Sequence, residues 1–219
     1  DTYVEAGVEA TWDHGAARHL DVDDRPAGIA YLRFDLSTLP APVRSATLVL
    51  HCTNPARDGG TVYPVTESGW TEGTGRNRTT ADGPGLTWSQ VDTNGDGRID
   101  AGDGSLVPDL ARPLATIGPV DLGATATAHL TAAAFQSGPG RYTLAIRNDD
   151  VDGASYVSRE GAVAAEHPRL RLVLAPPPPL DLVPVADTYV EAGADAARDR
   201  GPSDHLDVDN RPLDMAYLK

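Results

Sequence analysis

The sequence predicts an all-β fold in which two antiparallel sheets pack face to face. In four stretches, apolar residues alternate with polar ones at a period of two, which is typical of strands with one buried face. Aromatic residues make up only 5% of the 219 residues, whereas Gly (22) and Pro (18) are plentiful, as many turns between short strands require. Runs with a helical period are too short to build a helical layer.

The strand predictions follow the chain. Leu32, Phe34 and Leu36 share one face of the first strong stretch, and the other three are SATLVLHC (45–52), RYTLAIR (141–147) and RLRLVL (169–174). Two packed sheets would bury all four apolar faces, with Cys52 as a small buried hydrophobe. Weaker strands are predicted at 2–5, 19–22, 62–66, 125–130 and 155–158. The segment LTWSQV (86–91) is also interpreted as a strand, and short helical patterns occur at 130–135 and within 105–116.

An internal repeat sets the expected domain boundary. DTYVEAG at residues 1–7 returns at 187–193, HLDVDDRP at 19–26 returns as HLDVDNRP at 205–212, and the two copies align without a gap. The repeat unit is therefore roughly 186 residues long. We expect a complete module at 1–175, a stiff Pro-rich linker at 176–185, and the opening strands of a second, truncated copy at 186–219.

One segment has the residue spacing of an EF-hand calcium loop. DTNGDGRIDAGD (92–103) carries side-chain oxygens at alternating positions, a Gly at the sixth position and an apolar residue at the eighth. The last ligand position holds Asp instead of the usual Glu, as in dockerin-type loops. The sequence thus predicts a Ca²⁺ site formed by Asp92, Asn94, Asp96, the backbone carbonyl of Arg98, Asp100 and Asp103; the alternative is a metal-free surface turn.

A second ion site is a weaker expectation. Asp1, Asp21, Asp23 and Asp150 belong to acidic clusters that would converge at one end of a sandwich. The first three recur in the second copy as Asp187, Asp207 and Asp209. Ion pairs with Arg25 or Arg33 would leave the same pattern, so both interpretations stay open.

Composition excludes several classes of function. The net charge of -14 argues against nucleic acid as a partner. The sequence has no apolar stretch long enough to span a membrane and no signal peptide, and a chain that begins with Asp1 is expected to be a piece of a longer secreted protein. We find no catalytic motif of the GxSxG, HExxH or Walker type, and we expect no enzymatic activity.

Several phrases together resemble a known family. AYLRFDLS (30–37), SATLVLHC (45–52), SGWTEG (68–73) and SREG (158–161) with the following Pro168 are similar to DNRLRE-type modules, also called disaggregatase-related repeats. Some of these are classed as carbohydrate-binding modules. The resemblance implies a jelly-roll β-sandwich, secretion, tandem repetition in surface proteins and, in some members, binding of acidic polysaccharide. The calcium-loop segment is an insertion relative to this family.

Two functions follow from these observations. The repeat and the stiff linker favour a structural or adhesive building block of an extracellular stalk or filament, with neighbouring copies as partners and a donated opening strand as one means of assembly. The alternative is a carbohydrate-binding module. Its aromatic candidates for stacking on sugar rings are Trp12, Trp70 and Tyr156, although Trp70 is favoured as a core or loop anchor.

Overall fold

The computed structural model describes residues 1–76, 85–100, 102–135, 137–176, 179–180, 182–208, 210 and 214–219. It divides into two compact units, Asp1–Pro176 and Pro177–Lys219. The strands of the first unit are β1 (Thr2–Glu5), β2 (His19–Asp24), β3 (Ala27–Asp35), β4 (Val43–Asn54), β5 (Gly60–Val65), β6 (Ala115–Ile117), β7 (Thr125–Leu130), β8 (Arg141–Arg147), β9 (Ala154–Val157) and β10 (Arg169–Leu174). The second unit contains β11 (Asp187–Glu191) and β12 (Asp214–Leu218).

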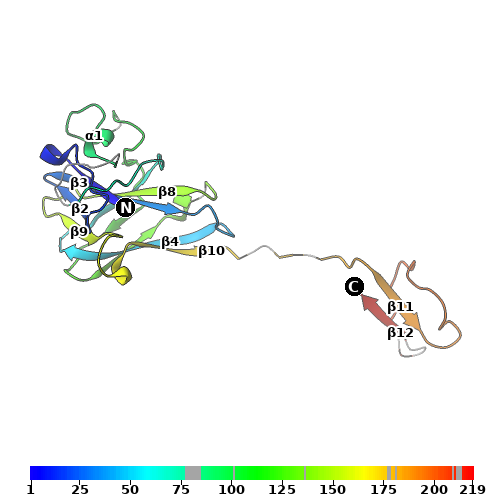
Figure 1. Cartoon of the computed structure of the whole chain (residues 1–219). Coiled ribbons are helices and arrows are strands. Elements are labelled where there is room, and N and C mark those ends of the chain that lie inside the picture. Colours follow the sequence, from blue (N-terminus) through cyan, green and yellow to red (C-terminus); the bar gives the residue numbers. More distant parts are fainter. Residues whose placement is uncertain are drawn as a thin grey trace. The chain divides into compact units, whose positions relative to one another are not determined.

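The ten strands of the first unit fold into two layers, as the sequence predicts. All pairs are antiparallel, and the order β10-β4-β9-β2-β3-β8-β5-β6 is completed by β1 beside β3 and β7 beside β4. We call β1, β3, β8, β5 and β6 the first layer, and β10, β4, β7, β9 and β2 the second layer. The hydrogen-bonded β2–β3 hairpin joins the two layers (Figure 1).

The main core lies between the two layers. Alternate residues of β4 and β7 point into it, including Leu48, Leu50 and Ala128, and they meet Leu32 and Leu144 from the first layer. Full burial of such a side chain contributes roughly 1.5–3 kcal/mol. The alternation that predicts these strands therefore also supplies their stability, and the all-β sandwich prediction is confirmed.

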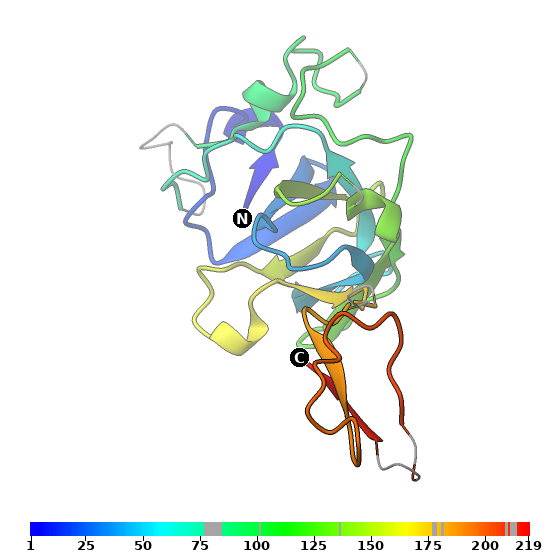
Figure 2. The same cartoon turned by 90° about the vertical axis from the view of Figure 1, so that its right-hand side faces the viewer.

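A second apolar cluster covers the outer face of the first layer. Residues 66–76, 85–100 and 102–108 contribute to it and place Trp70, Trp88 and Ile99 against Ile29 and Tyr31. The hydroxyl of Tyr31 donates a hydrogen bond to the Leu106 carbonyl at 3.0 Å. Figures 1 and 2 show α1 (Trp88–Val91) and its flanking loops outside the strands on this side of the first unit.

The strand prediction for LTWSQV is wrong, because Trp88–Val91 form helix α1. Thr87 and Gln90 make a capping box in which the Thr87 backbone N–H donates to the Gln90 side chain at 3.0 Å. These local bonds favour a helical turn in a segment whose polar and apolar residues also alternate. Of the two predicted helical patterns, 130–135 contains the short 3₁₀ segment η2 (Ala132–Phe135), which follows β7. The other, within 105–116, contains turns and the start of β6 and no helix. The remaining 3₁₀ segments are η1 (Gly7–Glu9) and η3 (Ala164–Glu166).

The strand pair β11–β12 of the second unit repeats the strand pair β1–β3 of the first unit. Thr188 pairs with Tyr217 and Val190 with Met215, in the same register that pairs Thr2 with Tyr31 and Val4 with Ile29. In the first unit β1 lies on β3, so that unit already has its own opening strand. A donated strand would have to displace β1.

Candidate functional site

The side-chain oxygens of the Asp and Asn residues in loop 92–103 accept hydrogen bonds from backbone N–H groups of the same loop. The Asp92 carboxylate accepts hydrogen bonds from Gly95 N at 2.8 Å and Gly97 N at 2.9 Å. Both glycines have positive φ, 73° and 79°, which turns the chain around this carboxylate. Asn94 and Asp96 continue the pattern by accepting from the N–H groups two residues further on.

Asp103 closes the loop. One of its oxygens accepts from Thr93 N at 2.8 Å and Asn94 N at 3.2 Å, and the other accepts from Asp100 N at 3.0 Å. Desolvation by slight burial opposes ionisation of Asp103, but the bonds from the backbone outweigh it and hold the pKa of this carboxyl below its usual value. The ionised side chain of Asp103 thus holds the C-terminal end of the loop against Thr93 and Asn94 near its N-terminal end.

The loop is fixed to the body of the first unit at two points. Ile99 is buried in the second apolar cluster, and the indole N–H of Trp88 donates to an Asp92 oxygen at 3.1 Å. The side chains predicted as metal ligands in 92–103 all offer carboxylate or amide oxygens, which Ca²⁺ prefers. Asp92 Oδ1 and Asp103 Oδ2 each accept one N–H bond and keep a second lone pair for a cation, whereas Asp92 Oδ2 and Asp103 Oδ1 each accept two. The residues therefore fit calcium chemically.

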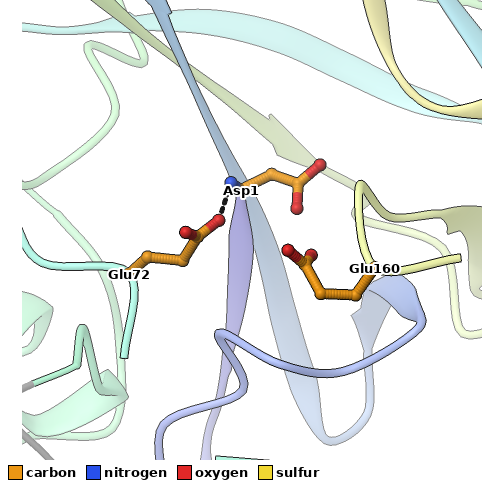
Figure 3. Close-up of side chains that lie close together, drawn as sticks. All are labelled: Asp1, Glu72 and Glu160. Carbon is orange, nitrogen blue, oxygen red and sulfur yellow. Dashed lines mark hydrogen bonds and ion pairs between the residues drawn. The ribbon is translucent and has the colours of Figure 1, made fainter. Parts of the chain in front are cut away.

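A different group of carboxylates comes together among the described residues (Figure 3). Within the described part of the chain, Asp1, Glu72 and Glu160 form the one set of three His, Cys, Asp or Glu residues whose ligand atoms all lie within 4.8 Å of one another. Glu72 is bound by the amino group of Asp1 and by Arg159 Nη2, the latter at 2.6 Å. The cluster is therefore partly neutralised by protein cations.

The expected convergence of Asp1, Asp21, Asp23 and Asp150 is not observed. Asp21 instead accepts a hydrogen bond from the Ser155 hydroxyl and lies 3.2 Å from His19 Nε2. Asp23 accepts from Arg25 N at 3.1 Å, and Asp150 from Asp152 N at 3.2 Å. Each carboxylate closes a turn or a local contact of its own, so among the described residues these four do not build a common ion site.

Two of the three aromatic candidates are part of the interior. Trp70 is buried, its indole N–H donates to Thr143 at 3.0 Å, and Arg33 lies 4.6 Å from the centre of its ring. Tyr156 is fully buried and donates its hydroxyl to the Gly59 carbonyl at 2.6 Å. Neither ring has a free face for a sugar, whereas Trp12 is partly exposed.

The outer face of the second layer carries a different set of polar groups. The side chains of β4, β7 and β10 that point away from the core are Ser45, Thr47, Val49, His51 and Thr53; Thr125, Thr127 and His129; and Arg169, Arg171 and Val173. Sequence analysis missed this face as a site. The alternation of apolar and polar residues identifies the three strands. It does not show that they lie side by side, because β4 pairs with β10 and with β7 across long stretches of sequence.

The described part of the chain has no helix long and apolar enough to cross a membrane. A comparison with curated proteins gives no match. A comparison with family models gives one: residues 1–94, from before β1 to the start of the calcium-loop segment, match carbohydrate-binding module family 96. This stretch of the chain is therefore similar to a family of carbohydrate-binding modules.

Proposed function

We propose that the first unit is a non-catalytic carbohydrate-binding module. The match of residues 1–94 to carbohydrate-binding module family 96 carries this proposal. The matched stretch holds β1 to β5 and α1, but its core also needs apolar side chains from β7, β8 and β9. The whole of Asp1–Pro176 is therefore the smallest unit that we take as the module.

The ligand we propose is a polysaccharide with acidic groups. The resemblance to disaggregatase-related modules supports this class, because some of those modules bind acidic polysaccharide. Burial of Trp70, Trp88 and Tyr156 also removes three of the large aromatic rings that neutral-sugar stacking would use. Recognition then falls mainly to charged and hydroxyl side chains.

We propose in addition that Asp92, Asn94, Asp96, Arg98, Asp100 and Asp103 hold a Ca²⁺ ion with a structural role. The ion would supply positive charge among carboxylates that otherwise repel one another. Because Ile99 and Trp88 are buried in the second apolar cluster, an ion that fixes the loop would also stabilise this cluster on the first layer.

A structural or adhesive repeat is the second candidate. Its support is the identical register of the opening hairpins in the two units, which indicates tandem copies of one module. Repetition and glycan binding are compatible, since tandem modules raise avidity for a polymer. An extracellular or cell-surface location fits both functions.

Affinity electrophoresis of the full chain tests the proposal. We expect gels that contain polygalacturonate to retard the folded chain, while gels with neutral dextran leave its mobility unchanged. Heat-denatured chain is the control for retardation by charge alone. If neither polysaccharide alters the mobility, with or without calcium, the carbohydrate-binding proposal fails.

A further inference from the structure

Three neighbouring strands of this acidic protein contain no acidic residue. The chain has 32 Asp and Glu residues against 18 Lys and Arg. Nevertheless β4 (VRSATLVLHCTN), β7 (TATAHL) and β10 (RLRLVL) have Arg44, His51, His129, Arg169 and Arg171 and neither Asp nor Glu. His51 lies 3.7 Å from Glu166 of η3, so the local positive charge of this part of the second layer, opposite in sign to that of the molecule, comes from its arginines.

The strand register places four of these groups, namely His51, His129, Arg169 and Arg171, on one face. Arg171, Thr47 and His129 lie side by side across β10, β4 and β7, and the next row is Arg169, Val49 and Thr127. A hydrogen bond of 3.2 Å between Thr47 Oγ1 and His129 Nδ1 joins two strands on this face. With strands about 4.8 Å apart, each row spans roughly 10 Å.

The guanidinium groups of the face are available to a ligand. Arg171 is exposed and has no hydrogen bond or ion pair to the described residues. Arg169 donates to the carbonyl oxygens of Ala164 and Ala165, at 3.0 and 2.6 Å, which fixes its direction without neutralising its charge. Elsewhere in the chain many arginines pair with carboxylates within 4.0 Å, namely Arg25, Arg112, Arg141, Arg147, Arg159, Arg198 and Arg200.

We propose that the outer face of β10, β4 and β7 is the binding platform for an anionic polysaccharide chain. Guanidinium groups bind carboxylate or sulfate groups with two parallel hydrogen bonds, and the Thr and Ser hydroxyls between them pair with sugar hydroxyls. A flat sheet face fits an extended polymer better than a small ligand, which needs a deep pocket. This inference rests on the proposed function and adds the site and the basis of recognition.

The charge of the rest of the molecule favours a saccharide over nucleic acid. Duplex DNA carries one negative charge per about 1.7 Å, so many of its phosphates would come within the screening distance of the carboxylates that surround the face in a protein of net charge -14. A polyuronate has at most one charge per sugar and several hydroxyls beside it. At physiological salt, charges beyond about 8 Å are largely screened, so the local positive face can act despite the acidic remainder.

Two variants of the full chain that each add a negative charge to this face test the platform. Arg171→Glu removes the unpaired guanidinium, and Thr127→Glu places a carboxylate on the neighbouring row; both side chains are exposed and leave the core intact. Arg112→Glu is the matched control, because it changes the net charge as much as Arg171→Glu but lies in the segment that leads to β6 of the first layer. Binding is measured by titration calorimetry with polygalacturonate, dextran sulfate, neutral dextran and single-stranded DNA.

We expect each platform variant to weaken polygalacturonate binding at least about tenfold, the loss of one charge-assisted contact, and Arg112→Glu to change it less than about threefold. Equal loss for dextran sulfate would make the site a general anionic-saccharide platform, and loss for polygalacturonate alone would assign it to carboxylates. Polygalacturonate binding unaffected by both variants overturns the site but leaves the proposed function standing. If single-stranded DNA binds as tightly as polygalacturonate, and both platform variants weaken its binding equally, the assignment to a saccharide is overturned. If no polysaccharide binds, the proposed function is refuted as well.

Discussion

His14 is a buried histidine whose counterpart in the second unit is an arginine. Its side chain has 0% exposure, its ring stacks on Tyr3 at 4.0 Å, and its Nε2 lies 3.5 Å from Glu9. Burial lowers its pKa to about 4, although Asp13 and Asp21 act in the opposite direction. Arg200 takes this place in the second unit, over the ring of Tyr189 and 2.6 Å from Glu191.

The lowered pKa predicts a dependence of stability on pH. Between pH 6.5 and about 4 the unfolded chain binds a proton at this histidine and the folded chain does not, so the free energy of unfolding falls as the pH drops through this window. The contribution is roughly 3 kcal/mol at most. His14→Phe should remove it, and chemical denaturation at pH 7 and pH 4.5 should show a smaller difference for the variant. An unchanged difference between the two pH values would contradict the assignment to His14.

Among the elements, loop 92–103 holds the proposed Ca²⁺ site and also contacts the apolar cluster on the outer face of the first layer through Ile99. Asp92 accepts bonds from Gly95, Gly97 and Trp88, so it connects the first half of the loop with helix α1. We expect calcium at a hundredfold excess over its Kd to stabilise the chain by about 2.7 kcal/mol.

Asp92→Ala should abolish this stabilisation, because it removes the first ligand and the bonds that shape the turn. Thermal unfolding with calcium and with a chelator measures the effect, and the exposed Asp121→Ala outside the loop serves as the control. Equal melting temperatures of the unmodified chain in calcium and in chelator would refute the structural role of the ion.

The elements also show what the sequence could predict. Period-two alternation identified β1, β4, β7, β8 and β10 because each has one face in the core. It misassigned 86–91, where the capping bonds of Thr87 and Gln90 decide the local structure. It also missed the cluster formed by Glu72, Glu160 and Asp1, since loops far apart in the sequence bring these three together. Local patterns therefore gave the strands, whereas the sites depend on long-range pairing.

At the scale of the whole molecule, the two units differ in what covers their apolar residues. Val22 and Tyr31 are 0% exposed in the first unit, whereas their counterparts Val208 and Tyr217 are 78% and 54% exposed in the second. A two-stranded hairpin is marginally stable alone in water. The first unit is thus the part of the chain with a complete core, which is why we propose the carbohydrate-binding function for this unit.

An NMR titration of the isotope-labelled chain with short polygalacturonate oligomers locates the binding face residue by residue. We expect the shifted backbone amides to lie on β4, β7 and β10, including those of Thr47, Thr127 and Arg171, while the amides of β11 and β12 stay unchanged. Shifts confined to the first layer and α1, or no shifts at saturating oligomer, would contradict this expectation.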